Sequence, residues 1–411
     1  MIPESIKKTN LIESFLSLSS LQFINMLLPL IVLPYLVRVI GADYFGLISV
    51  ALSVVMLFNL FVEFGFNLSA TKSVSINRSN IQKISSIFFN VFYSKLILLF
   101  TSLIALIIST IFVEYLSKNI VLFYITFGLV LGNLLLPIWF YLGVEKMRSV
   151  TVITVLFKII STILVFIFIK DKDDYILFPL FNSIALIASG TVAFIYAYYR
   201  FNLIFCKPSI SEIKNQIKTS AHFFLSRFST QGSRHIVIAL IGFSFGNLIA
   251  GFYAMADKIY MAAMSIGGVA SQTLYPFMSA KKDLIIFRKI FISIISFVVI
   301  ILFPCIYFEE QLLFLLFNLK EPILSKLFII LMLSLPFGVI SQLVGYPLLA
   351  AFNFDKHANN SLIFSSIIYL LTVFLILIFT NDIFYVAASV IIYNISRVGF
   401  AFYYIKINKI I

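Results

Sequence analysis

The chain has 411 residues, of which 61% are hydrophobic and only 11% are charged. Soluble globular domains contain about 25% charged residues, so this composition excludes an ordinary water-soluble protein. The formal net charge is +13, because 30 Lys and Arg outnumber 17 Asp and Glu. We therefore expect an integral membrane protein with a surplus of basic residues.

Continuous apolar runs follow one another along almost the whole chain. A spanning helix needs about 20 apolar residues, and runs without period-two alternation favour helices over a β-barrel. The twelve predicted spans are residues 14–37, 45–67, 86–112, 119–142, 149–169, 175–199, 220–243, 248–279, 286–308, 324–352, 359–380 and 383–405. Too few residues remain outside these spans to form a soluble domain.

Lys and Arg are unevenly distributed between the two sides of this topology. With the N-terminus inside, the inner segments hold 18 of them and the outer segments hold 6. Basic loops are retained on the cytoplasmic side, so we predict that both termini are cytoplasmic. This bias accounts for most of the net charge, which therefore does not indicate a nucleic-acid partner.

The twelve spans divide into six and six near residue 205, and the two halves show weak similarity. Gly41 and Gly46 occupy places at the start of the second span that resemble those of Gly242 and Gly251 at the eighth. Halves with an even number of spans form a parallel repeat with a cavity between them. We predict an all-α protein with an N-terminal six-helix lobe, residues 1–205, and a C-terminal six-helix lobe, residues 206–411, around a central cationic cavity.

The division is marked by a polar, basic stretch, Arg200–Thr219. Within it, Ser211–Lys218 is interpreted either as a short amphipathic helix on the inner membrane surface or as an ordinary basic linker.

Charged residues inside the predicted spans are the most informative feature of the sequence. A charge at the bilayer centre costs at least about 2.5–3.5 kcal/mol, so such residues usually have a function. Only two acids, Glu63 and Asp257, lie at comparable positions, so the interior is predicted to attract an anionic molecule. The six intramembrane cations are Lys95, Lys158, Arg227, Arg234, Lys258 and Arg397.

Span seven is unusually polar from Ser226 to His235. Arg227 and Arg234 are seven residues apart, which is two helical turns, so we expect them to share a face. Guanidinium groups contact phosphate in a bidentate manner, so the two together suit a pyrophosphate. The structural alternative is that each arginine pairs with a neighbouring helix or with backbone carbonyls.

The other charged positions each allow two interpretations. Asp257 either forms an ion pair, with Arg234 as a candidate, or titrates as the carrier of a coupling proton. Lys95 either faces the interior or extends to the inner interface. Glu63 lies near the inner end of its span, where a carboxylate can reach water. Lys158 and Arg397, like Lys258, are assigned to the cationic interior.

Motifs for cofactor chemistry are absent. The chain has no G-x-x-x-x-G-K-[ST] loop, and its three histidines and two cysteines are scattered, so we predict no cofactor and no metal site. Cys206 and Cys305 fall on opposite sides of the membrane, which argues against a disulfide. The D-x-D pattern at Asp171 and Asp173 lies in a short outer loop and is interpreted as a solvated turn.

Three motifs resemble the O-antigen flippases of the Wzx type, which belong to a superfamily with multidrug exporters and the lipid II flippase. The motifs are Leu33–Gly46, Pro137–Met147 and Gly251–Ile259, followed by Tyr275–Ser279. In the family, the motif that corresponds to Pro137–Met147 often has Phe-Gln before its glycine. This chain has Tyr141-Leu142 there, so no role of that Gln is carried over.

The resemblance implies a bacterial inner-membrane protein, not an enzyme, that moves an undecaprenyl-diphosphate-linked oligosaccharide to the periplasmic leaflet. Alternating access would be driven by a proton or sodium gradient or by the membrane potential. An O-antigen polymerase and a chain-length regulator would be partners. The six cations would bind the lipid pyrophosphate. Asp257 and Glu63 would either couple transport to the ion gradient or gate it.

Other functions remain open at this point. A multidrug exporter shares the fold, but a cationic interior would repel its usual cationic substrates. A polymerase or ligase is expected to carry a large periplasmic loop, whereas the longest outer loop here is around Glu309–Glu321. An assembly protein without transport would leave the six cations without a reason.

Overall fold

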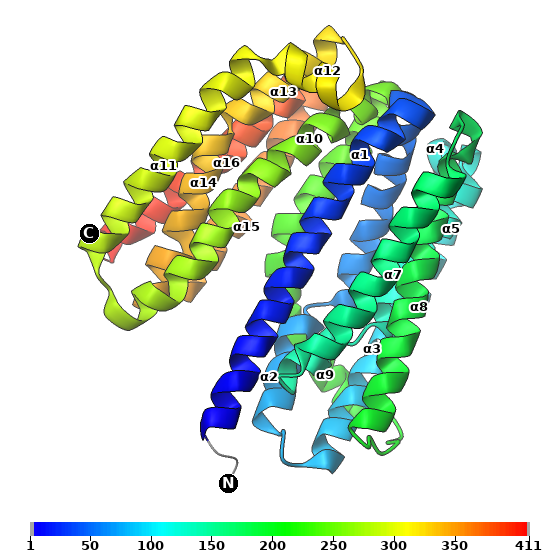
Figure 1. The fold of residues 1–411 in the computed structure, drawn as a ribbon, viewed down its shortest axis with the longest axis vertical. Helices are drawn as coiled ribbons and strands as arrows, with labels where there is room; N and C mark the ends of the chain where they lie inside the picture. Colours follow the sequence, from blue (N-terminus) through cyan, green and yellow to red (C-terminus); the bar gives the residue numbers. More distant parts are fainter. Residues whose placement is uncertain (1–3, 409–411) are drawn as a thin grey trace. The chain divides into compact units, whose positions relative to one another are not determined.

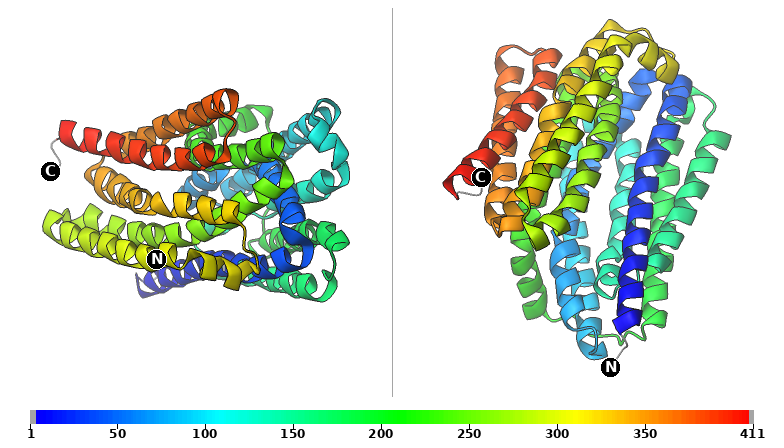
Figure 2. Two further views of the ribbon diagram at one scale, coloured as in Figure 1. Left: turned by 90° about the horizontal axis from the view of Figure 1, so that it is seen from above. Right: turned by 60° about the vertical axis from the view of Figure 1, so that its left-hand side comes forward.

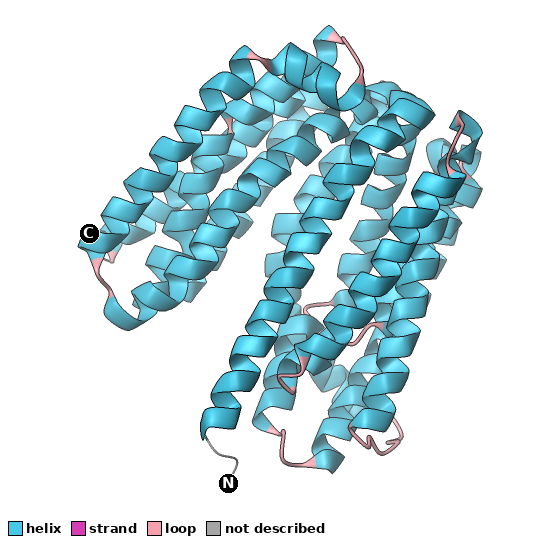
Figure 3. Cartoon of the chain, viewed as in Figure 1, coloured by secondary structure: helices cyan, strands magenta, loops and turns pink. Residues whose placement is uncertain are grey.

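The computed structural model describes residues 4–408, with side chains described at residues 21 and 24 and from residue 27 onward. This part of the chain consists of helices joined by short loops, without a strand, which confirms the predicted all-α class (Figure 3). Several helices begin at a side chain that accepts hydrogen bonds from the first turn, as Asn80, Asp283 and Asp382 do. Such caps satisfy backbone N–H groups that have no partner within the helix.

Contacts divide the chain into two compact units. Unit 1 comprises the residues up to Gly41 together with Val50–Phe228, and unit 2 comprises Ala42–Ser49 and everything from Ser229. The division therefore falls after residue 228 and not at the boundary drawn from the sequence between residues 205 and 206. Two lobes of six spans each stay a prediction.

Unit 1 is built on helices α1 to α9 and the 3-10 helix η1, except for the segment Ala42–Ser49 of α1 (Figure 1). Its helices are α1 (Glu4–Glu63), α2 (Phe66–Ile76), α3 (Ile81–Phe112), α4 (Glu114–Lys118), α5 (Ile120–Leu135), α6 (Ile138–Gly143), α7 (Met147–Phe168), η1 (Lys172–Ile176), α8 (Leu177–Arg200) and α9 (Ile210–Arg227). Helix α8 packs along both α5 and α7, and α2 packs on α6. Buried rings fill the space between them: Phe88 contacts Trp139 and Phe140, with ring centroids 5.8 and 5.1 Å apart.

Unit 2 contains the remaining long helices. They are α10 (Ser233–Lys281), α11 (Leu284–Tyr307), α12 (Glu309–Phe317), α13 (Pro322–Leu333), α14 (Leu335–Val344), η3 (Gly345–Leu349), η4 (Ala350–Phe352), α15 (Asp355–Phe379) and α16 (Ile383–Ile407). Helices α15 and α16 lie side by side, and α10 packs against α13 and α14 (Figure 2). A buried apolar cluster that includes Met278, Leu348, Leu349 and Ile405 forms part of the core. By contrast α11 buries only Phe287 and Val298.

Ten helical stretches among the described residues are long and apolar enough to cross a membrane. Two of these stretches, Leu27–Ile76 and Ile210–Lys281, each cover two of the predicted spans, and each contains a glycine with non-helical backbone angles. The structure thus shows a multi-pass membrane protein. The number of twelve crossings and the cytoplasmic position of both termini stay predictions.

The two glycines that break α1 and α10 have nearly the same conformation. Gly41 has φ 83° and Gly246 has φ 82°, a region that side chains other than glycine rarely adopt. The sequence comparison paired Gly41 with Gly242, so the structure moves that match to Gly246. The match of Gly46 with Gly251 agrees with the structure, because each glycine lies five residues after its break.

These two later glycines meet within unit 2. A Cβ atom on Gly46 would overlap the backbone oxygen of Asn247, and one on Gly251 would overlap the backbone oxygen of Ala42. The reciprocal contact shows why both positions lack a side chain: the segment Ala42–Ser49 lies backbone to backbone against α10.

The predicted surface helix at Ser211–Lys218 is not a separate element. These residues form the first half of α9, which continues without interruption to Arg227. The Glu212 carboxylate accepts hydrogen bonds from Ser86 Oγ, at 3.0 Å, and from Asn90 Nδ2. These contacts fix the start of α9 on α3, so the stretch is helical and not a linker. Its place on the inner membrane surface stays a prediction.

Candidate functional site

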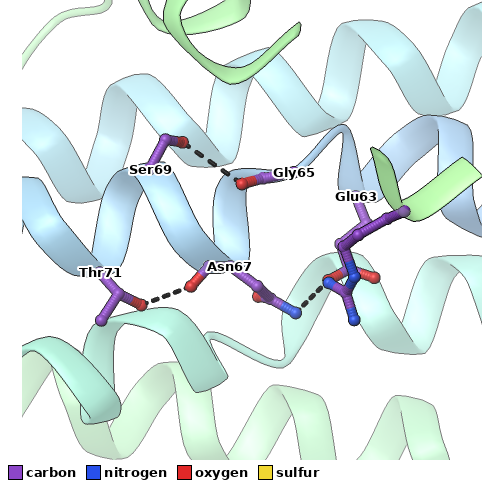
Figure 4. Close-up of polar contacts among 6 residues, drawn as sticks. Glu63, Gly65, Asn67, Ser69 and Thr71 are labelled. Atoms are coloured by element: carbon purple, nitrogen blue, oxygen red, sulfur yellow. Dashed lines mark hydrogen bonds and ion pairs between the residues drawn. The ribbon is translucent and has the colours of Figure 1, made fainter. Parts of the chain in front are cut away.

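The first intramembrane carboxylate, Glu63, forms an ion pair with Arg227 in unit 1. Its carboxylate also accepts a hydrogen bond from the Asn67 side chain (Figure 4). The side chain of Glu63 is 17% exposed and that of Arg227 is 31% exposed. Glu63 therefore does not face water alone, because two protein donors bind its carboxylate inside the unit.

The chain builds this pair by a sharp break between α1 and α2. Phe64 and Gly65 both have positive φ, 40° and 76°, and Gly65 begins α2 (Figure 4). Helix α9 passes so close that a Cβ on Gly65 would lie 2.8 Å from Phe223 Cβ. The Phe64 ring stacks on Phe224 with centroids 4.5 Å apart. Glycine is required here because of its positive φ and because α9 approaches its backbone closely. This close approach places the end of α9, with Arg227, beside Glu63.

Lys95 lies beside this pair, on α3. Its side chain is buried, with 4% exposure, which excludes the interpretation that it extends to the membrane interface. It lines a cavity of about 30 Å³ together with Glu63, Asn59, Asn67 and Asn133. A cavity of this volume can hold a water molecule, because about 10–15 Å³ suffices. The carbonyl oxygen of the Asn59 side chain is buried there without a hydrogen-bond partner among the described residues.

The second intramembrane carboxylate, Asp257, pairs with Arg234 in unit 2. Arg234 Nε donates to Asp257 Oδ1 at 3.0 Å, and Nη2 donates to the other oxygen. This is the bidentate geometry in which guanidinium–carboxylate pairs are strongest. Asp257 is 4% exposed, so the predicted ion-pair alternative for this residue is confirmed.

The seven-residue spacing of Arg227 and Arg234 does not place them on one α-helical face. Residues Phe228–Gly232 between them form a π-helical turn, η2, which holds more residues per turn and changes the phase of the helix. Arg227 belongs to unit 1 and Arg234 to unit 2, and each binds its own carboxylate. The expectation of two arginines presented together on one face is therefore corrected.

The remaining cations are placed differently. Lys258 follows Asp257 but has an exposed side chain, Arg397 on α16 is half-buried, and Lys158 lines a polar cavity in unit 1. Among the residues whose side chains the structure describes, no carboxylate lies at ion-pair distance from Lys95, Lys258 or Arg397. The cationic surplus predicted from the sequence thus persists after both intramembrane acids have been paired.

Asp257 is surrounded by buried polar side chains that were not identified from the sequence. Tyr253 and Tyr260 lie on α10 on either side of Asp257, and both are buried. The Asn394 amide of α16 donates to the Tyr260 hydroxyl at 2.9 Å, and Tyr253 is hydrogen-bonded to Tyr369 of α15. The seven-residue spacing of the two tyrosines within an apolar run is the sequence signal that could have identified them.

The outer-loop aspartates form a turn, as interpreted from the sequence. The backbone N–H groups of Lys170 and Asp171 donate to the Asp174 carboxylate at 2.8 and 3.0 Å. These two hydrogen bonds lower the pKa of Asp174, since they stabilise its charged form. Within the described range, no three His, Cys, Asp or Glu side chains gather where they could hold a metal ion.

Comparison with known proteins decides the family. A family model described as polysaccharide biosynthesis protein matches residues 11–282, which is more than half of the chain. The chain belongs to this polysaccharide biosynthesis protein family. The resemblance to polysaccharide transporters of the Wzx type is thereby confirmed.

Two relatives of this family member carry the name "Putative O-antigen transporter". The one from Escherichia coli (strain K12) is 26% identical over 273 residues, which are 66% of this chain and 66% of the relative. The one from Shigella dysenteriae is 26% identical over 256 residues, or 62% of this chain and 64% of the relative. The match therefore spans slightly less than two thirds of the length of either relative.

Solved structures show that the family member has a transporter fold. The lipid II flippase MurJ in an inward closed conformation aligns with a TM-score of 0.76 at 16% identity, covering 94% of this chain and 87% of that one. An inward-facing multidrug resistance MATE family transporter aligns with a TM-score of 0.67 at 14% identity, covering 97% and 98%. At these identities the likeness concerns the fold alone.

The family-like motifs have identifiable structural roles in this polysaccharide biosynthesis protein. Leu33–Gly46 contains the Gly41 break, and Gly251–Ile259 contains Asp257. Pro137–Met147 forms α6 and the turn after it, where Arg78 binds Glu145 at 2.7 Å. Tyr141, in the place of the frequent Phe, is fully buried and donates from its hydroxyl to the Ala193 backbone oxygen at 2.6 Å.

Proposed function

We propose that this protein flips an undecaprenyl-diphosphate-linked oligosaccharide from the cytoplasmic to the periplasmic leaflet by alternating access, without covalent chemistry. The observation that carries the proposal is the cationic surplus inside the membrane. Both intramembrane acids are occupied by arginines, yet Lys95, Lys258 and Arg397 remain without a carboxylate at ion-pair distance in the described chain. A diphosphate is the anionic group that the family resemblance supplies to match this charge.

The exposure and pairing of the six cations indicate which of them can contact the lipid headgroup. Lys258 is exposed and Arg397 is half-buried, so both can contact a headgroup without rearrangement. Arg227 and Arg234 are held by carboxylates and would contact phosphate only in exchange for them. Lys95 and Lys158 line cavities within unit 1, where they raise the local positive potential.

The two Arg–carboxylate pairs suggest how transport would be coupled to an ion gradient. When a proton neutralises Glu63 or Asp257, the paired guanidinium loses its counter-ion and becomes available for a phosphate. Binding of the diphosphate and of the proton would then be linked, because each stabilises the state that the other requires. A sodium ion at either carboxylate would act in the same way.

Flipping can be measured with the protein in liposomes that contain a fluorescent undecaprenyl-diphosphate oligosaccharide. A hydrogen bond to a charged group contributes about 1.5–3 kcal/mol, so Lys258→Ala and Arg397→Ala should each slow flipping about tenfold or more. Lys214→Ala, on the exposed part of α9, is the matched control. Wild-type rates in a Lys258→Ala and Arg397→Ala double variant would refute the headgroup role.

A multidrug exporter is the second candidate, because a MATE transporter shares the fold. The same liposomes discriminate between the two, since an exporter would accumulate a cationic dye and leave the lipid in place. An O-antigen polymerase and a chain-length regulator are proposed as partners that use the flipped lipid. Location in the bacterial inner membrane follows from the same proposal, since the lipid is made there.

A further inference from the structure

A second, larger cavity lies wholly within unit 1. It has a volume of about 370 Å³ and is bounded by α1, α5, α7 and α8, with Ile138 of α6 at one side. It shares Asn133, Leu136 and Ile138 with the small cavity beside Lys95, so the two cavities are neighbours. Its polar lining consists of Asn133, Thr154, Lys158, Ser161, Asn182 and Ser189.

Two of these polar groups have no hydrogen-bond partner in the described chain. Thr154 and Ser189 donate to backbone oxygens of their own helices, at 2.7 and 3.1 Å. For the Ser161 hydroxyl and the Asn133 amide the described chain provides no hydrogen bond, although Ser161 is only 3% exposed. The Asn182 amide donates one hydrogen bond to Phe178 and keeps its oxygen available.

Unsatisfied polar groups inside a membrane protein require a partner, because each costs free energy when it is removed from water. The cavity is far larger than one water molecule, and its volume lies in the usual range of small-molecule sites, about 300–1,000 Å³. It therefore has room for a polar ligand with several donors and acceptors.

The chemistry of the lining selects among ligands. Amides and hydroxyls both donate and accept, as the hydroxyl groups of a sugar do. A diphosphate would need more than the one cation, Lys158, that the larger cavity offers. A cationic drug finds no carboxylate in this lining. Sugars therefore match it better than either alternative.

We propose that this cavity is a subsite for a sugar of the lipid-linked oligosaccharide, recognised by the side chains of Asn133, Ser161 and Asn182. The proposal rests on the flippase function proposed above and adds to it the place where the sugar is distinguished from the lipid diphosphate.

The test compares two lipids on the purified full-length protein. One is undecaprenyl diphosphate without sugar, and the other is the pool of lipid-linked oligosaccharides extracted from cells that produce this protein. Binding is followed by the concentration-dependent shift of the thermal unfolding midpoint. Three or more new hydrogen bonds of about 0.5–1.5 kcal/mol each should make the sugar-bearing lipids bind at least about tenfold more tightly.

Asn133→Leu, Asn182→Leu and Ser161→Val keep the approximate volume and remove the hydrogen bonds. Each should reduce the difference between the two lipids while the response to bare undecaprenyl diphosphate persists, which also shows that the variant is folded. Thr191→Val, on α8 with a hydroxyl bonded to its own helix, is the control and should retain the difference.

The outcomes separate the two proposals. A wild-type protein that responds to neither lipid contradicts the flippase function itself. Equal binding of both lipids by the wild-type protein would overturn the proposed sugar subsite. Variants that keep the full preference for the sugar-bearing pool would overturn it as well, since the cavity would then contain only water.

Discussion

Arg234 and Asp257 are 23 residues apart in α10, yet their side chains meet in a bidentate ion pair. The non-helical Gly246 lies between them, so the pair joins the two helical segments on either side of that break. Glu63 and Arg227 form the corresponding pair in unit 1, across 164 residues of sequence. Each compact unit therefore contains one arginine whose charge is balanced by the one intramembrane acid of that unit.

Replacing Asp257 by Asn should destabilise the protein, because Arg234 would be left with an unbalanced charge in a buried site. Breaking a buried pair by removing one partner typically costs about 3–5 kcal/mol. We expect a lower thermal unfolding midpoint and less protein in the membrane. Asp355→Asn, at an exposed helix start, is the control.

The charge-reversed variant Arg234→Asp with Asp257→Arg separates structure from transport. If Asp257 serves only the ion pair, the reversal should restore both abundance and flipping. Restored abundance without gradient-driven flipping would assign Asp257 the coupling role. A well-expressed Asp257→Asn protein with normal gradient-driven transport would exclude that role.

Lys95→Met should stabilise the protein and reduce transport. The buried ammonium has no ion-pair partner in the described chain, whereas methionine has a similar length and carries no charge whose burial costs free energy. We expect a higher unfolding midpoint together with slower flipping in liposomes. Lys83→Met, on the exposed start of the same helix, should change neither; a Lys95→Met protein of lower stability would show that the lysine is structural.

Gly65→Ala should be strongly destabilising. Its φ of 76° costs a side-chain-bearing residue about 1–2 kcal/mol, and the added Cβ would press on Phe223 at 2.8 Å. Because Gly65 positions α9, loss of the Glu63–Arg227 pair should accompany the loss of stability. Gly399→Ala is the matched control, since no atom lies within 4 Å of its Cβ position. That variant should be neutral or slightly stabilised, and equal midpoints for the two would contradict the packing described here.

Reporter fusions test the proposed topology. Fusions after Lys83, Lys214 and Lys282 should report the cytoplasm, because the basic segments are expected on that side. Fusions after Lys118, Asp173 and Asn381 should report the periplasm. A periplasmic signal at Lys214 would be incompatible with twelve crossings.

The sequence alone was sufficient for the class of protein, and it identified the charged residues that lie within its apolar helices. Apolarity over about 20 residues is a local property, and the cost of a buried charge does not depend on which helix lies beside it. The motif around Gly41 and Gly46 was also local enough to indicate the family correctly. For the same reason the seven-residue spacing of Arg227 and Arg234 was misleading, because a single π-helical turn between them changes the helical phase.

Only the tertiary structure decided which charges are balanced and where polar side chains gather. The Glu63–Arg227 pair depends on the passage of α9 over Gly65, and the burial of Lys95 depends on helices far away in sequence. The polar cavity near Lys158 is assembled from several helices that each contribute one or two side chains. Such contacts follow from long-range packing, in which small residues set how closely helices approach, and no local pattern in one segment encodes its partner in another.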